Sequence, residues 1–582
     1  MNDFAPLDRH LAKPGRHSPQ RAYKIASKIV QRSGLAHAFR ESIDSPTGRP
    51  MDVSWHELMT IFIVHGITKT DMHLTRVEET ATELIAARLV TGTRTGRVTY
   101  DHIANNLHRI QAHLAAGTVA SAHHHRWVDK RSGELPPCPD TCGGGRPIGP
   151  DEFSSILLDA SVPEGVIDTT SWALDSTDFE TWGARRSWRR RPDIAPGEDQ
   201  PDKADSAPDR STDEWPRTGA DGRDQHSLDP EARVGYKSGK NGAPKCTFMG
   251  YDNHIIVPVP APGGRPVPHV ALSLVTAPAG SSKASAGLRA VDAVNSIETR
   301  SVKTLLSDRG YTFRLAEDWA LHLVGRGIES IHDLHTSQLG QRPGPKPGTV
   351  WVDGTLYSSA LPTRLRKLNQ FTLGMADEAK RELQEQYNER LPYRFDAVPH
   401  GSRPGSQRLR GPALKKHVRC PNTPRSMRAN FDRPTTNCVL GEECGCGTTV
   451  VVHAEEQARE RQRIPFGTTE WAASYGRRSA IEHFNAEIKG NRGVRIERGF
   501  TRVYGAVKNQ VLVTFALVGA NVRLLRDWHI CRSIADPWMA LIDDTDDPDW
   551  SVAHARFKRR QPRVRAFHEA YYASRGRPLQ AA

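Results

Sequence analysis

Four short apolar runs between residues 171 and 308 constrain the fold of this chain more than any other feature. They are SWALDST (171–177), CTFMGYDNHIIVPV (246–259), PHVALSLVTA (268–277) and VKTLLSD (302–308). Their length and their β-branched and aromatic residues are typical of strands. A helical pattern, SAGLRAVDAVNSIE, lies between the last two runs. Three strands, a helix and a fourth strand predict a mixed sheet with helices, and therefore an α/β or α+β fold.

Helical periodicity dominates on either side of this region. Before it, apolar residues recur at helical spacing in residues 55–67, 76–90 and 100–117. A helical module of this kind could bind DNA or could serve only as a scaffold. After it, the apolar stretch 511–522 predicts a buried helix, because it is shorter than the roughly 18 residues that a membrane span needs.

The 582 residues are too many for one hydrophobic core and predict several domains or a large domain with insertions. A stretch rich in charge, Pro, Gly and Ser predicts a mobile loop at 183–235. The sheet pattern stops near residue 334, and an amphipathic helix follows only after residue 465. The predicted divisions are therefore a helical N-terminal domain (1–150), the first part of the sheet domain (151–334), an inserted subdomain (335–465), the second part of the sheet domain (466–530) and a basic C-terminal tail (531–582).

The composition favours a polyanionic partner. The chain has 80 Lys and Arg against 67 Asp and Glu, a formal net charge of +13 and a pI near 9.4, and nucleic acid is the commonest polyanion. The first residues contain no apolar segment typical of a secretory signal, and eight cysteines are too few for a disulfide scaffold of this size. We expect a cytoplasmic protein with no membrane partner.

Acidic residues stand where two of the predicted strands end. Asp175 follows the apolar residues of WALDST, and Asp308 closes VKTLLSD ahead of a glycine turn. An Asp before a turn is often only a turn former. Asp168 and Asp178 lie close to Asp175 and are alternatives to it, although the apolar run before Asp175 favours that residue.

The segment YGRRSAIEHFNAEIKG, read as one helix, presents four polar residues on one stripe. Tyr475, Arg478, Glu482 and Lys489 fall within roughly 60° of each other at about 100° per residue, while the apolar residues collect on another face. The simplest interpretation is a solvated face with an Arg478–Glu482 pair, worth a few tenths of a kcal/mol. Alternatively, Glu482 is a third carboxylate that converges with Asp175 and Asp308 on two divalent cations.

The spacing Tyr475, two residues, Arg478, three residues, Glu482, six residues, Lys489 resembles the Y-(2)-R-(3)-E-(6)-K signature of a group of bacterial insertion-sequence transposases of the DDE superfamily. The context is also similar, because strand–Asp, strand–Asp-Arg-Gly-Tyr, a long insertion and then the helix follow one another. The resemblance covers about residues 155–525.

This resemblance implies a ribonuclease H-like catalytic domain with a large insertion between the second and third acids. It implies that Asp175, Asp308 and Glu482 are catalytic and bind two Mg²⁺ (or Mn²⁺) ions. It also implies that Tyr475, Arg478 and Lys489 contact DNA. The expected function is transposition: metal-dependent cleavage at the terminal inverted repeats of an element and strand transfer into target DNA.

Because two element ends must be cut together, we expect a homodimer on double-stranded DNA, associated with the nucleoid. Two rival functions remain open. A related nuclease would cut without joining strands, and a non-catalytic DNA-binding protein derived from a transposase would keep the basic surfaces without the reaction. The second rival should have lost an acid, and all three candidates are present.

A cysteine cluster lies in the predicted insertion. Cys420, Cys438, Cys444 and Cys446, with His417 nearby, could close a tetrahedral structural zinc site. Their spacing is not a pair of CxxC knuckles, which favours the alternative interpretation that they are free thiols. Cys138 and Cys142, near three consecutive histidines (123–125), form a weaker candidate.

Overall fold

The protein is described here by a computed structural model of the chain. The structure describes residues 18–44, 51–117, 119–120, 147–183, 185–190, 223–237, 246–372, 374–398, 406–427, 433–490, 494–532 and 534–543.

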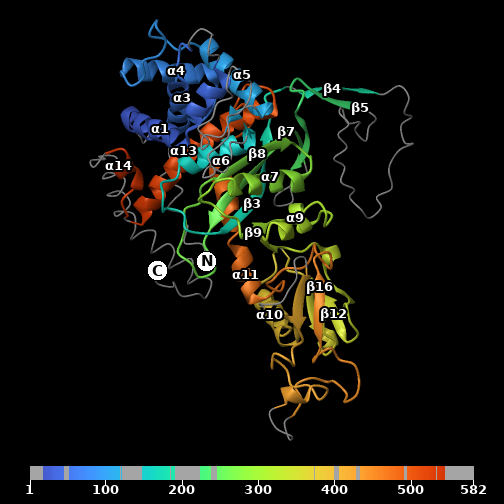
Figure 1. The fold of residues 1–582 in the computed structure, drawn as a ribbon. Helices are drawn as coiled ribbons and strands as arrows, with labels where there is room; N and C mark the ends of the chain where they lie inside the picture. Colours follow the sequence, from blue (N-terminus) through green and yellow to red (C-terminus); the bar gives the residue numbers. More distant parts are fainter. Residues whose placement is uncertain are drawn as a thin grey trace, which may run out of the picture.

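A six-stranded mixed sheet forms the centre of the molecule (Figure 1). The strand order is β10-β9-β3-β7-β6. β6 pairs with residues 246–250 of β7, and β8 pairs with residues 251–256 on the same edge of β7. β3 is antiparallel to β7 and parallel to β9, and β9 is parallel to β10. The bounds are β3 (Ser171–Glu180), β6 (Arg233–Lys237), β7 (Cys246–Val259), β8 (Ser273–Pro278), β9 (Thr304–Ser307) and β10 (Glu329–His332). The predicted mixture of sheet and helices is confirmed, and so are the four predicted strands.

Both faces of the sheet are buried. Along β3, Trp172 and Leu174 pack into one hydrophobic cluster with α7 (Lys283–Asn295), while Ala173 packs into a second, larger cluster on the other face. This alternation follows from the two-residue period of a strand. The predicted helix between the last two strands is α7, so a helix crossover joins β8 to β9, which is parallel to β3.

The N-terminal helices do not form a core of their own. They contribute to the larger cluster together with α13 (Ala506–Cys531), the buried helix expected around residues 511–522. Figure 1 shows α13 running between these helices and the sheet. The bounds are α1 (Pro19–Ser33), α2 (Leu35–Ile43), α3 (Trp55–Thr68), α4 (Leu74–Ala86), α5 (Tyr100–Ala115), β1 (Val119–Ala120), β2 (Pro147–Ile148) and α6 (Pro150–Ala160).

Side-chain amides of α13 bind the backbone of β8 and of the segment before it. Asn521 accepts a hydrogen bond from the Ala271 amide (2.9 Å) and donates one to the Ala271 carbonyl (2.8 Å). Gln510 accepts from the Thr276 amide (3.0 Å) and donates to the Leu274 carbonyl (3.0 Å). Backbone groups that would be costly to bury unpaired are thereby satisfied.

Asp71 lies between α3 and α4, where the N-terminal helices contact the segment ahead of α13. It pairs with Arg76, and its neighbour Met72 donates its amide to the Phe500 carbonyl (2.9 Å). Burial alone would raise the pKa of Asp71, but hydrogen bonds from His65 and Arg76 outweigh it and hold the pKa at about 2.

A depressed carboxyl pKa stabilises the fold above the unfolded-state pKa of about 3.9 and loses this effect as the pH falls through about 2. We therefore expect Asp71→Asn to lower the free energy of unfolding by about 1–2 kcal/mol at pH 7. This difference from the wild type should narrow as the pH falls below 4. Thermal unfolding at pH 7 and at about pH 2 measures this. Glu79→Gln, an exposed position on the same helix α4, is the control. An equal loss from both substitutions, or a difference from the wild type that is as large at pH 2 as at pH 7, contradicts the prediction.

The insertion extends from the sheet on the side opposite the N-terminal helices (Figure 1). Two three-stranded antiparallel sheets form it, β11-β12-β13 and β14-β15-β16, with small hydrophobic clusters of their own. The insertion also contains the helix α10. The bounds are β11 (Gln341–Pro343), β12 (Thr349–Val352), β13 (Thr355–Ser358), α10 (Asp377–Asn388), β14 (Asp396–Ala397), β15 (Ser406–Arg410) and β16 (Thr449–His453).

The stretch 183–235, expected to be a loop, contains strands at both ends. β4 (Arg185–Arg190) pairs antiparallel with β5 (Arg223–Ser227), and β6 joins the central sheet. Residues 191–222 lie outside the described residues, as do Cys138, Cys142, the neighbouring histidines and most of the basic tail. Within the described ranges, no helix combines the length and apolar character needed to cross a bilayer.

Candidate active site at the ends of two parallel strands

The register of the sheet brings Asp175 and Asp308 together. Leu174 of β3 pairs with Ser307 of β9 in the parallel ladder, so the two aspartates are the next residues along neighbouring strands. Asp308 is also the N-cap of the short helix α8 (Arg309–Thr312), where its side chain accepts a hydrogen bond from the Gly310 amide (2.9 Å). Asp308 therefore forms the turn and also lies beside Asp175.

The electrostatics of Asp175 show that the two carboxylates interact. Burial raises the pKa of Asp175 to about 6, and the negative charge of Asp308 adds to this rise. Arg478 and Lys283 oppose it as cations. Because each negative charge disfavours ionisation of the other acid, a bound cation would stabilise the ionised form of both.

The signature segment reaches the sheet as two helices, α11 (Thr469–Gly476) and α12 (Ser479–Lys489). The prediction of one continuous helix is wrong at Arg477 and Arg478, where hydrogen bonds from residue i+3 to residue i replace the α-helical pattern. Such a tightened turn changes the local axis but keeps the chain helical in character. α12 packs across β3 and β7, and its apolar face, including Ile481 and Phe484, is buried.

Arg478 lies between the acids of the strand and the helix. It pairs with Glu482, and its Nη1 lies 3.8 Å from the Asp175 carboxylate. Burial lowers the pKa of Arg478, but the neighbouring Tyr475, Glu482 and Asp175 raise it on balance. Arg478 thus lies near both Asp175 and Glu482, and the charge of Asp308 also acts on it. The Glu482 side chain is 54% exposed.

Tyr475 and Lys489 lie at opposite ends of this arrangement. The Tyr475 ring stacks on Trp471 (centroids 4.9 Å apart, planes 11° apart) and faces the Arg478 guanidinium 5.6 Å away. Burial raises the pKa of Tyr475, so its hydroxyl stays protonated. Lys489 forms an ion pair with Asp178.

The three candidates for the first acid occupy different surroundings. Asp175 stands beside Asp308, Asp178 pairs with Lys489, and Asp168 lies exposed in the segment before β3. The charge of Asp308 contributes to the raised pKa of Asp175.

Sequence reasoning missed several polar groups at this site. Asn485 donates to Asp175 (3.3 Å), and the Lys283 ammonium donates to Ser176 (2.8 Å) beside it. Asp333, after β10, pairs with Arg309 at 3.1 Å. Asn485 could have been found, because it lies three residues after Glu482 on the same helical face. No local sequence pattern predicts that Lys283 and Asp333 belong to this site, because only the folding of the sheet places them there.

The four cysteines of the insertion lie together and could bind a metal such as zinc. His417 is not one of the group, because its Nε2 bonds to the Asp396 carboxylate at 2.6 Å. Comparison with known proteins found no match for the chain among protein-family models, curated proteins or solved structures.

Proposed function

We propose that this protein is a DDE-type DNA transposase that cleaves element ends and joins them to target DNA. The observation that carries the proposal is the meeting of Asp175 and Asp308, at the ends of adjacent parallel strands, with Glu482 on a helix packed across the same sheet. The order of elements supports a ribonuclease H-like catalytic domain. The strands β3, β6, β7 and β8 with antiparallel pairings are followed by a helix crossover, the parallel strands β9 and β10, an insertion, and then the helix with the third acid.

The chemistry of the three acids suits hard divalent cations. The donors are carboxylate oxygens, which Mg²⁺ and Mn²⁺ prefer. Burial, and after it the charge of Asp308, raises the pKa of Asp175. Two such ions, when bound, would activate the attacking water or 3′-hydroxyl and stabilise the leaving oxygen. The same donor set serves cleavage and joining, because both are in-line displacements at phosphorus.

Arg478 supplies positive charge at the centre of the acids in the absence of DNA. In the proposed complex its guanidinium would exchange a carboxylate for a backbone phosphate, which frees Glu482 to act as a ligand. Lys489 would likewise exchange Asp178 for a phosphate, and Tyr475 would contact DNA beside Arg478. The net charge of +13 favours this association, and cleavage at two ends favours a homodimer on nucleoid DNA.

The test uses a DNA fragment that carries the natural sequences flanking the gene for this chain. With Mg²⁺ or Mn²⁺ we expect cleavage at defined positions in these flanks, and insertion of precleaved 3′ ends into a supercoiled plasmid. Cleavage without insertion would favour the nuclease. Binding without cleavage in either metal would favour a non-catalytic DNA-binding protein.

A further inference from the structure

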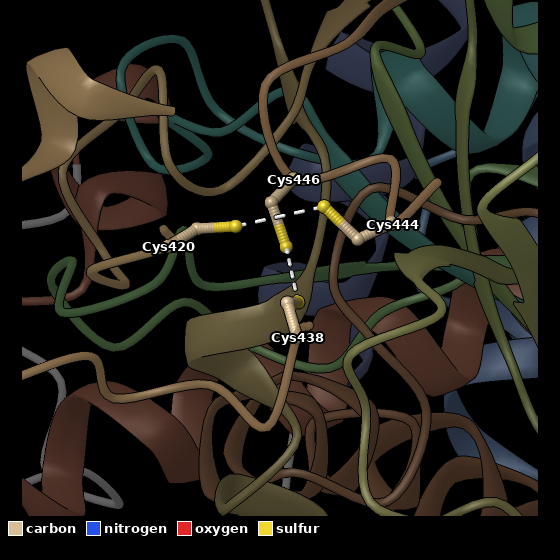
Figure 2. A group of neighbouring side chains, drawn as sticks. All are labelled: Cys420, Cys438, Cys444 and Cys446. Atoms are coloured by element: carbon tan, nitrogen blue, oxygen red, sulfur yellow. Dashed lines mark hydrogen bonds between the residues drawn. The ribbon is translucent and has the colours of Figure 1, made fainter. Parts of the chain in front are cut away.

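Four sulfur atoms meet at one point in the insertion. Figure 2 shows Cys420, Cys438, Cys444 and Cys446 directing their side chains toward a common centre. All four Sγ atoms lie within 4.8 Å of one another, with 3.5 Å between those of Cys420 and Cys444 and 3.8 Å between those of Cys438 and Cys446. All four are free thiols, so no disulfide explains their proximity.

These distances match a tetrahedral site around a single ion. With zinc–sulfur bonds of about 2.3 Å, the sulfurs of a regular tetrahedron stand about 3.8 Å apart. A set of four cysteines leaves no open position for a substrate, so an ion here would have a structural role.

Polar groups around the sulfurs suit thiolates better than an apolar core of neutral thiols. The Asn422 amide nitrogen lies 3.6 Å from the Cys444 sulfur, and the Ser358 hydroxyl lies 3.3 Å from the Cys446 sulfur. Hydrogen-bond donors of this kind orient thiolate ligands and offset their charge. The apolar neighbours in the same cluster are few, Ala413 and Val418 among the fully buried ones.

The backbone around the cluster is fixed by contacts that only glycine permits. Gly445 has a φ of +66°, and a Cβ at this position would lie 2.1 Å from the Gly348 carbonyl oxygen. Gly348, just before β12, has a φ of +73°, and its Cβ would lie 2.4 Å from the Gly445 nitrogen. The turn that carries Cys444 and Cys446 therefore rests directly on the backbone of the first insertion sheet.

The same turn also contacts the second sheet, because the Ala413 amide, shortly after β15, donates to the Cys446 carbonyl at 3.0 Å. The cluster thus lies where the two small sheets of the insertion meet. The apolar core that the two sheets share is small, with Trp351 and Leu356 from the first sheet and Leu409, Val450 and Val452 from the second. We propose that the four cysteines bind one structural Zn²⁺ ion that fastens the two sheets of the insertion together. This proposal is independent of the reaction at Asp175, Asp308 and Glu482.

The test is the metal content of the full-length chain purified under reducing conditions. We expect about one zinc per chain in the wild-type protein, and a drop of at least about tenfold in Cys444→Ser. Cys531→Ser is the matched control, because Cys531 is not in a disulfide and lies at the end of α13, outside the cluster. Equal zinc in Cys444→Ser and the wild type, iron in place of zinc, or no metal in the wild type after incubation with Zn²⁺ would overturn the proposal.

A second measurement covers the case in which Cys444→Ser does not fold. Co²⁺ bound to the wild-type chain should give the intense visible bands and the sulfur-to-metal charge-transfer band of a tetrahedral thiolate site. Chelation should then increase proteolysis within residues 406–453 and leave the central sheet protected. A cobalt spectrum without thiolate bands, or equal protease resistance of the insertion with and without metal, would also overturn it.

Discussion

Glu482→Gln is expected to reduce metal-dependent cleavage of end DNA by about 10³-fold or more, since a ligand of the cation pair contributes several kcal/mol to the transition state. Glu482 is 54% exposed and pairs with Arg478 four residues earlier. If this pair were the only role of Glu482, the substitution would cost a few tenths of a kcal/mol of stability and would leave activity intact. The two interpretations therefore differ by orders of magnitude in the rate of cleavage.

The matched control for this prediction is Glu470→Gln. Glu470 is an exposed glutamate in the first turn of α11, and the structure gives it no contact with the acids of the site among the interactions described. Both variants should unfold at the temperature of the wild type and bind DNA as the wild type does. Cleavage by Glu482→Gln at the wild-type rate would remove Glu482 from the proposed active site, and an equal loss in both variants would point to a general effect of charge.

Gly519→Ala is expected to destabilise the protein by about 3 kcal/mol or more, because two helix backbones touch at this position. A Cβ at Gly519 of α13 would lie 2.2 Å from the carbonyl carbon and oxygen of Gly66 in α3, and one at Gly66 would lie 2.5 Å from the Phe515 carbonyl oxygen. Arg523 adds to the same crossing by donating to the Gly66 carbonyl at 2.6 Å. A methyl group must push the helices apart or break these contacts.

The control for this substitution is Gly325→Ala, at the last residue of α9 (Ala320–Gly325), where a Cβ meets no atom within 4 Å. This variant should be neutral or slightly more stable, since Ala is the better helix former. Thermal unfolding of both variants measures the effect, and we expect Gly519→Ala to lower the apparent melting temperature by more than about 5 °C. Equal melting temperatures for the two variants would mean that α3 and α13 can separate at little cost.

The two predictions test different parts of the molecule. Loss of cleavage in Glu482→Gln would report on the side chains around Arg478, and the substitution leaves the hydrophobic core unchanged. Loss of stability in Gly519→Ala concerns the attachment of the N-terminal helices to α13, which also carries the amides that bind the backbone around β8. The first tests the proposed catalytic reaction, and the second tests the stability of the fold.

Local patterns predicted the elements of the sheet domain well. The strands at β3, β7, β8 and β9 and the helix α7 lie where short apolar runs and helical periodicity put them. The helix break at Arg477 and Arg478 was missed, because both residues are compatible with a helix and the turn depends on how α11 and α12 pack on the sheet. The strands β4 and β5 were missed because their residues are mostly charged and lack the apolar alternation of a strand.

The sequence by itself determined which side chains are available for chemistry: the aspartates after two apolar runs, the spaced row from Tyr475 to Lys489, and four cysteines in one insertion. These follow from local order, which sets strand and helix periods. Only the tertiary structure decided which of them meet. Parallel pairing of β3 with β9 places Asp175 beside Asp308. Arg478 lies near both Asp175 and Glu482, and Lys489 pairs with Asp178. The packing of two small sheets brings the four cysteine sulfurs together. Contacts between residues far apart along the chain depend on how whole elements pack, and no local pattern contains that information.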